Sequence, residues 1–231
     1  MSEEQTNERY SRQKDIVPAD RIANCKATVI GVGAIGRQVA SQLTAIGIQW
    51  LQLIDFDSVE ESNLASQGYL EDDLGRHKVD ATADLCHQTN HNLELYTINE
   101  RFKRTTKIGN VVFCCVDSIT TRRLIWEAVK NKVNFYCDGR MSAEVLRVLT
   151  ACDSQSRQHY PTTLFQQEEA FVGPCTARTT IYCANIAAGL MVGQFAKYLR
   201  RLPIDPDIQM NLLASELSVN QIGDDKLGVR I

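Results

Sequence analysis

Several common features are absent from this sequence of 231 residues. Its eight cysteines include no C-x-x-C pair, and structural zinc sites usually draw ligands from such pairs, so a zinc ribbon is not expected. The first residues, MSEEQTNERYSRQKD, contain no apolar core of a secretory signal, which predicts a cytoplasmic location and reduced thiols. A net charge of −3 gives no general reason to bind nucleic acid or an anionic membrane. Any anion site must therefore be local.

Long uninterrupted apolar runs are also missing. The longest apolar segment, residues 181–199, is broken by Asn185, Gln194 and Lys197. A membrane-spanning helix needs about 20 predominantly apolar residues with few or no charges. The segment therefore predicts a buried helix of a folded domain.

Short β-branched runs alternate with helical patterns along most of the chain. Strands are expected at 27–32, 50–55, 93–99, 110–117, 134–139 and 144–151, and helices at 34–46, 78–89, 120–131 and 179–201. This alternation predicts a Rossmann-like α/β fold, with a mainly parallel sheet and helices on both faces. Residues 1–231 would form a single domain, with an N-terminal arm at 1–24 and a long crossover loop at 152–178. The tail at 208–219 fits either a helix or a strand.

A glycine pattern, Gly31-Val-Gly33-Ala-Ile-Gly36, follows the first expected strand and opens the first helix. Such a loop lets the backbone approach a phosphate and points helix N–H groups at it. Asp55, about twenty residues further on, is suited to bind a ribose hydroxyl. Both NAD enzymes and some ATP enzymes use this arrangement, and tight strand-helix packing without a ligand is the alternative. Because ligands lie beyond the carboxyl ends of parallel strands, the loop, Asp55, Asp57 and Asp117 are expected on one rim.

Four further segments distinguish ATP from a dinucleotide. They read RYSRQ at 9–13, DFDSVEESNLASQGY at 55–69, LGRHKVDA at 74–81 and FCCVDSITTRR at 113–123. In this order and spacing they resemble the ThiF/MoeB family, the adenylyltransferases related to ubiquitin-activating enzymes. The resemblance covers residues 9–123 and extends more weakly to Arg201. It favours ATP as the ligand of the glycine loop.

The resemblance implies an activity and a set of site residues. A member would bind ATP and Mg²⁺ and adenylate the C-terminal carboxylate of a ubiquitin-like or sulfur-carrier β-grasp protein, as a homodimer. Asp55 would bind the ribose, Asp117 would hold Mg²⁺ and Lys78 would contact phosphate, while Arg12 would reach ATP from the partner subunit. The other implied nucleotide-binding residues are Gly31, Gly33, Ala34, Gly36, Asp57, Asn63 and Gln67. A conjugating enzyme or sulfur donor would be a further partner.

The residues themselves leave alternatives for these positions. Asp117 ends an apolar run, where an unpaired buried carboxylate would be costly unless a metal or base relieved it. An N-cap for the next helix is the alternative. Lys78 without its neighbours would be read as an ordinary solvated lysine, and Arg12 as a surface charge.

Cys175 is the candidate nucleophile for a thioester, a step that ubiquitin-activating members of the family perform. It stands in VGPCTARTT, after a Gly-Pro turn and before an expected helix, whose dipole would lower the thiol pKa. A small buried thiol is the alternative. Arg12, Lys78, Asp117 and Cys175 are therefore the candidate catalytic residues, and Cys137 is the second candidate for the thiol.

One departure from the family pattern bears on activity. The family reads asparagine, leucine, any residue, arginine, glutamine, whereas Ser66 stands at the position of the arginine. A serine hydroxyl cannot replace a bidentate cation, and Arg76, His77 and Arg140 are the candidates to compensate. Two other functions stay open: an ATP-dependent tRNA-modifying dehydratase of the same superfamily, and a non-catalytic ThiF-like scaffold.

Overall fold

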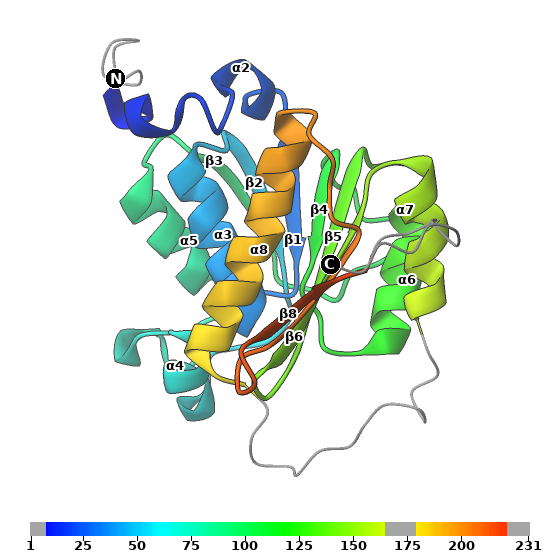
Figure 1. The fold of residues 1–231 in the computed structure, drawn as a ribbon. Helices are drawn as coiled ribbons and strands as arrows, with labels where there is room; N and C mark the ends of the chain where they lie inside the picture. Colours follow the sequence, from blue (N-terminus) through cyan, green and yellow to red (C-terminus); the bar gives the residue numbers. More distant parts are fainter. Residues whose placement is uncertain (1–7, 165–178, 221–231) are drawn as a thin grey trace.

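An eight-stranded sheet forms the centre of the computed structural model, which describes residues 8–164 and 179–220 (Figure 1). In chain order the strands are β1 (Lys26–Ile30), β2 (Trp50–Ile54), β3 (Glu94–Ile98), β4 (Val111–Cys114), β5 (Phe135–Ser142), β6 (Val145–Ala151), β7 (Asp207–Asn211) and β8 (Glu216–Val219). Their order across the sheet is β3-β2-β1-β4-β5-β6-β7-β8. The strands β3, β2, β1, β4 and β5 pair in parallel, and β6, β7 and β8 are added antiparallel. The predicted Rossmann-like, mainly parallel α/β fold is confirmed.

Helices cover both faces of this sheet. They are α2 (Ala19–Ile22), α3 (Ala34–Ile46), α4 (Glu61–Gln67), α5 (Lys78–Thr89), α6 (Ile119–Val129), α7 (Ser154–His159) and α8 (Ile181–Leu199), with 3-10 turns η1 (Ser11–Gln13), η2 (Glu71–Asp73) and η3 (Tyr160–Thr163). In Figure 1, α3, α5 and α8 lie on one face and α6 and α7 on the other. The side chains of strand β4 explain why both faces are covered. Val111 and Phe113 pack in one apolar core, and Val112 and Cys114 pack in the other. Successive side chains of a strand point to opposite faces, so a strand apolar throughout requires cover on both.

The strand order reverses between β1 and β4. Strands β2 and β3 extend the sheet to one side of β1, and β4 and β5 extend it to the other. In open α/β sheets, ligands bind at the edge where the carboxyl ends of the strands at such a reversal meet, here those of β1 and β4. The glycine loop follows β1, Asp55 follows β2 and Asp117 follows β4, so all three lie along that edge as predicted.

The prediction of a crossover loop at 152–178 is wrong for residues 152–164, the part of it that the structure describes. Residues 154–163 form α7 and η3, because Asp153 accepts a hydrogen bond from the Ser156 amide at 2.8 Å and begins the helix. Tyr160 then buries its ring 4.7 Å from the ring of Trp126, measured between centroids. Residues 165–178 lie outside the described residues. The undecided tail at 208–219 is extended, since β7 pairs with β6 and β8 with β7.

The described part of the N-terminal arm is attached to the end of α3 that lies farthest from the glycine loop. The Tyr10 ring packs on Gly47, which follows α3, and Gln13 Nε2 donates to the Ile46 carbonyl at 2.8 Å. Arg9 Nη1 donates to Asn90 Oδ1 at 3.1 Å, just beyond α5. Figure 1 shows the same arrangement, with the first helical turns at the top and α4 at the bottom. Within residues 8–164 and 179–220, no helix is both long and apolar enough to cross a membrane.

Candidate functional site

Packing accounts for two of the three glycines in the loop. Gly31 has φ +86°, and a Cβ there would come within 2.8 Å of the Cys115 backbone. A Cβ at Gly36 would lie 1.8 Å from the Gly31 carbonyl oxygen. Gly33 is different, because a Cβ would meet nothing closer than Gln67 Oε1 at 3.6 Å. Strand-helix packing therefore requires glycine at 31 and 36 and leaves the glycine at 33 for another reason.

The first turn of α3 is suited to an anion. Its leading amides, at Ala34, Ile35 and Gly36, have no intrahelical acceptor, since the first N–H groups of any helix lack one. No acidic residue lies in this turn, and the positive end of the dipole of this 13-residue helix is directed at the loop. An incoming phosphate would meet free N–H groups and an open backbone at Gly33.

Asp55 joins the ends of β1 and β2. It is 9% exposed, its Oδ2 accepts from the Val32 amide at 2.6 Å, and its Oδ1 accepts from the Asp57 amide at 2.9 Å. Each carboxylate oxygen can accept a second hydrogen bond. Asp55 therefore fixes the loop and keeps acceptor capacity for a hydroxyl group.

Lys78 is a buried cation at the start of α5. Its side chain is 8% exposed, and its Nζ lies 3.3 Å from Oδ2 of the half-exposed Asp57. The Lys78 amide also donates to the Asp57 carbonyl at 3.0 Å, which ties the two segments together. The interpretation of Lys78 as an ordinary solvated lysine is therefore wrong.

Asp117 is an exposed carboxylate, and the described part of the chain gives it no hydrogen bond or ion pair. The expectation of a costly buried carboxylate is wrong, because β4 ends at Cys114 and the chain reaches solvent before Asp117. The N-cap alternative is also wrong. Ser118 caps α6 instead, and its Oγ accepts from the Thr121 amide at 3.4 Å.

Two polar residues of α4 complete this edge. Asn63 Oδ1 accepts from the Glu60 amide at 3.0 Å, so Asn63 stabilises the start of α4. Gln67 directs its Oε1 toward Gly33, and this buried oxygen has no hydrogen-bond partner among the described residues. Since buried polar atoms are nearly always satisfied, Gln67 Oε1 indicates a missing donor beside the loop.

The three side chains expected to compensate for Ser66 are engaged elsewhere. Arg76 pairs with Asp73 and Asp84, and His77 Nδ1 lies 3.3 Å from Ser58 Oγ. Arg140 binds a buried carboxylate on its own strand. Ser66 Oγ donates to the Ser62 carbonyl at 2.7 Å, within α4.

Arg37 is a cation near the loop that the sequence analysis did not single out. It is 5% exposed, and its guanidinium lies 4.6 Å from the centroid of the Tyr69 ring. The Tyr69 hydroxyl donates to the Val32 carbonyl at 2.6 Å and so stabilises the glycine loop. Burial lowers the pKa of Arg37 from its usual value. Its place directly after Gly36 was the available signal.

Burial raises the thiol pKa of several described cysteines. Cys137 is fully buried, and burial raises its pKa to about 12, so it stays a neutral thiol at physiological pH. Burial likewise raises the pKa of Cys25 and of Cys152 to about 11. Cys137 as the second candidate nucleophile is therefore wrong. Cys175, the first candidate, lies outside the described residues.

Most of the predicted site residues share one rim, at the carboxyl ends of the parallel strands. Those at the rim are Gly31, Gly33, Ala34, Gly36, Asp55, Asp57, Asn63, Gln67, Lys78 and Asp117. Arg12 is not among them, because it lies exposed on η1 at the opposite end of α3. At 1.5 Å per residue, the 13 residues of α3 separate those two ends by about 20 Å.

Comparison with known proteins fits this geometry. The ThiF family model matches residues 10–221. The chain belongs to the ThiF family. The NEDD8-activating enzyme E1 catalytic subunit of Caenorhabditis elegans is 30% identical over 129 residues, which is 52% of this chain and 29% of that protein. The adenylyltransferase and sulfurtransferase MOCS3 of Dictyostelium discoideum is 33% identical over 132 residues, 52% of this chain and 31% of that protein. This ThiF chain thus spans about a third of the length of these relatives.

Solved structures share the fold of this ThiF chain. PaaA superposes with a TM-score of 0.77 at 23% identity, covering 96% of this chain and 84% of PaaA. Escherichia coli MccB, solved with ATP, gives a TM-score of 0.75 at 18% identity, covering 96% of this chain and 74% of MccB. The predicted family and fold are confirmed.

Proposed function

We propose that the protein adenylates the C-terminal carboxylate of a ubiquitin-like or sulfur-carrier β-grasp protein, with ATP as co-substrate. One observation carries the proposal. The backbone at Gly33 is open and faces the free amides of α3, while the cation of Lys78 and the unpaired carboxylate of Asp117 lie along the same rim. The naming of relatives as an activating enzyme and an adenylyltransferase supports it.

The residues at the rim fit ATP. The triphosphate would meet the α3 amides and Gly33, as phosphates do at helix N-termini. Asp55 would accept from a ribose hydroxyl with its remaining lone pairs, and the orphaned Gln67 Oε1 would accept from a donor on the nucleotide or on the partner. Asp57 and Asn63 would shape the pocket, while Lys78 would contact phosphate.

Asp117 fits Mg²⁺ shared with a substrate. Mg²⁺ is usually bound by one or two carboxylates together with substrate phosphates, and it keeps several waters. The described residues hold no group of three or more His, Cys, Asp or Glu arranged for a metal, so the phosphates would supply the other ligands. When bound, Mg²⁺ would neutralise charge on the leaving pyrophosphate.

In the proposed reaction a carboxylate oxygen of the carrier attacks the α-phosphorus of ATP. The new oxygen–phosphorus bond forms as the bond between the α-phosphorus and the bridging oxygen breaks, and pyrophosphate leaves. The carboxylate is a weak nucleophile, so positioning and charge neutralisation must supply most of the rate. The α3 amides would hold the phosphates, Asp55 would fix the ribose, and Lys78 would offset negative charge.

We further propose an oligomeric state, a thioester step and a downstream partner for this protein. The protein acts as a cytoplasmic homodimer, in which Arg12 of one subunit reaches ATP bound to the other. Cys175 accepts the adenylated carboxylate as a thioester and releases AMP. A conjugating enzyme or a sulfur donor then receives the activated carrier.

ATP-pyrophosphate exchange tests the activity. Labelled pyrophosphate should enter ATP only when Mg²⁺ and a β-grasp protein with a free diglycine C-terminus are both present. A panel of such proteins, each paired with a version lacking its last two residues, identifies the acceptor. ATP binding without exchange for any carrier would contradict adenylation and favour the non-catalytic scaffold, which Ser66 in place of the family arginine also supports.

Gly33→Ala and Gly36→Ala are expected to fail in different ways. At 36 the new methyl group overlaps the Gly31 carbonyl, so the free energy of unfolding should fall by about 3 kcal/mol or more. At 33 the methyl group has room, and the loss should stay below about 1 kcal/mol. Gly33→Ala should nevertheless weaken ATP binding at least about tenfold, because the methyl group occupies the approach to the phosphates.

Urea unfolding and calorimetric ATP titration measure the two effects. Gly75→Ala serves as a control for a glycine outside the loop, since a Cβ there would meet nothing within 4 Å, although its φ of +78° costs some stability. Wild-type ATP affinity in a folded Gly33→Ala protein would remove Gly33 from the site.

A further inference from the structure

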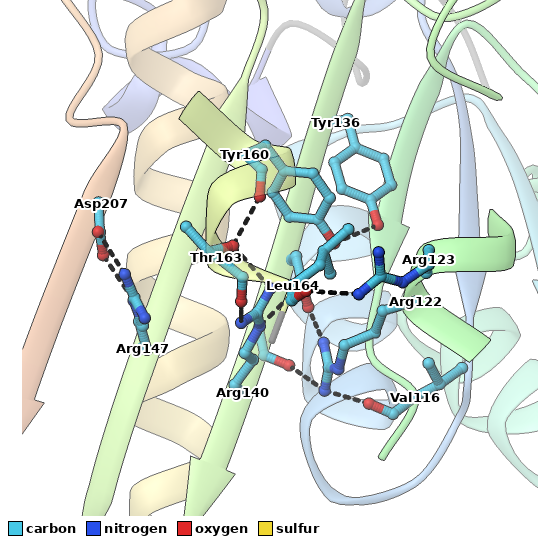
Figure 2. Close-up of polar contacts among 12 residues, drawn as sticks. Val116, Arg122, Arg123, Tyr136, Arg140, Arg147, Tyr160, Thr163, Leu164 and Asp207 are labelled. Atoms are coloured by element: carbon cyan, nitrogen blue, oxygen red, sulfur yellow. Dashed lines mark hydrogen bonds and ion pairs between the residues drawn. The ribbon is translucent and has the colours of Figure 1, made fainter. Parts of the chain in front are cut away.

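A fully buried carboxylate, Asp138 on β5, organises the part of the molecule beside the turn that bears Asp117. Arg122 of α6 and Arg140 of β5 both form ion pairs with it, and the Tyr160 hydroxyl donates to its Oδ2 at 2.8 Å. Tyr136 adds its hydroxyl 3.0 Å from that of Tyr160. Figure 2 shows the guanidinium groups of Arg122 and Arg140 converging below Tyr160. The adenylation chemistry proposed above uses none of these side chains.

Arg122 links this carboxylate to the turn that bears Asp117. Its Nη2 donates to the carbonyl of Val116, the residue before Asp117, and to that of Gly139 at 3.1 Å. The glycine loop packs on the same turn, since a Cβ at Gly31 would lie 2.9 Å from the Val116 amide nitrogen. The backbone at Val116 is therefore held by the glycine loop and by Arg122.

The same carboxylate is linked to the residues just before position 165. Arg140 donates to the Thr163 carbonyl at 2.8 Å and to its hydroxyl at 3.1 Å. Arg123, next to Arg122 on α6, donates to the Leu164 carbonyl at 2.5 Å (Figure 2). Two separate stretches of backbone, at 116 and at 163–164, are thus fixed by neighbouring arginines of one network.

Charge makes these links mutually dependent. Two guanidinium groups share one carboxylate, and the side chains of Arg122 and Arg140 are only 5% and 11% exposed. Loss of Asp138 would leave two buried cations close together, and loss of either arginine would change the charge felt by the other. The network therefore acts as one unit.

We infer that Arg122 and Asp138 are positioning residues, which hold Asp117 at the glycine loop and couple it to the backbone of Thr163 and Leu164. Neither touches the reacting atoms. This inference rests on the proposed function for the role of Asp117. The mechanical link between the two backbone segments does not depend on that role.

Arg122→Lys tests the positioning. A lysine can pair with Asp138, but its single ammonium cannot also reach both carbonyls as the planar guanidinium does. The Asp117 turn should then move, and a displacement of about 1 Å can cost about 10²-fold in turnover. We expect about that loss in the kcat of exchange, with an unchanged KM for the carrier. ATP affinity can also be measured by calorimetry at a series of Mg²⁺ concentrations. The Mg²⁺ concentration at which the affinity reaches half its maximum should rise about tenfold.

Arg157→Lys is the matched control. Arg157 also donates to three backbone carbonyls, those of Lys130, Val133 and Asn134, at 2.5, 2.7 and 3.3 Å, and these lie at the other end of α6. The Arg157→Lys variant should have a lower free energy of unfolding than the wild type, without any change in the Mg²⁺ dependence of ATP binding. The positioning role would be overturned if this Mg²⁺ concentration rose equally in both variants, or if it did not rise in Arg122→Lys.

Hydrogen exchange separates this inference from the proposed function. In Arg140→Lys, Thr163 loses its hydrogen bonds to the guanidinium, while Arg122 can still donate to the Val116 carbonyl. Faster amide exchange at residues 163–164 is therefore expected whether or not the two segments are coupled. Coupling requires faster exchange at 115–118 as well, and a change confined to 163–164 would overturn it. This readout needs no nucleotide and serves also if Arg122→Lys fails to fold. A wild-type protein that binds no ATP would refute the proposed function alone.

Discussion

Asp117→Ala is expected to reduce carrier-dependent ATP-pyrophosphate exchange on the order of 10³-fold. Among the described residues, the proposed role leaves Mg²⁺ with one carboxylate, so the variant would lose that ligand and the charge neutralisation that depends on it. Stability should not change, because Asp117 is exposed and forms no hydrogen bond or ion pair with the described residues. Exchange assays and thermal unfolding of the same preparations measure both quantities.

Glu127→Ala provides the control for Asp117→Ala. Glu127 is an exposed carboxylate near the other end of α6, and among the residues that the structure describes it pairs with Lys130 alone, at 2.6 Å. Its removal should leave both exchange and stability near wild type, since exposed ion pairs contribute little. An Asp117→Ala protein that keeps more than about a tenth of wild-type exchange would contradict the metal role.

Mixing two inactive variants should restore activity if Arg12 acts across a dimer. Arg12→Ala and Asp117→Ala subunits, combined in equal amounts and allowed to exchange, would form hybrids as half of all dimers. Each hybrid has one complete site, which combines Asp117 of one subunit with Arg12 of the other. About a quarter of wild-type exchange is therefore expected from two proteins that are each nearly inactive. The large separation of Arg12 from the glycine loop along α3 is the reason for this expectation.

The control for the mixture pairs Lys78→Ala with Asp117→Ala. Both residues belong to the same rim of one subunit, so no hybrid contains a complete site and no activity should return. Recovery in this control would show that subunit mixing does not report site composition. A full-activity monomer, or no recovery with Arg12→Ala, would exclude the shared site.

The Rossmann-like part of the fold could be predicted from local pattern alone. Helices α3 and α5 have the bounds 34–46 and 78–89 that the sequence predicted, because glycines or turn residues mark their ends and apolar spacing marks their faces. The short helices α4 and α7 were missed. Asp153 followed by Ser156 is a capping signal that would have revealed α7, but the surrounding polar residues masked it.

Tertiary contacts limited the rest. The tail at 208–219 could not be assigned, since β7 depends on pairing with β6 far back in the chain and β8 on pairing with β7. The site residues that follow strands were placed correctly on one rim, as the topology of parallel sheets dictates. The state of Asp117 and Arg140 was not predictable, because it depends on where β4 ends and on the burial of Asp138, which pairs with Arg140 on β5.

The contacts of Gly31 and Gly36 have a consequence for the thermodynamics of ligand binding. A Cβ at Gly31 or Gly36 would lie within 3.0 Å of neighbouring backbone atoms, so the folded core holds this backbone closely in place. Its conformational entropy is lost once, during folding, and is not lost again when a ligand arrives. The anion-binding backbone is thus preorganised, and the heat and entropy of nucleotide binding should reflect desolvation and the ordering of other segments rather than of this loop.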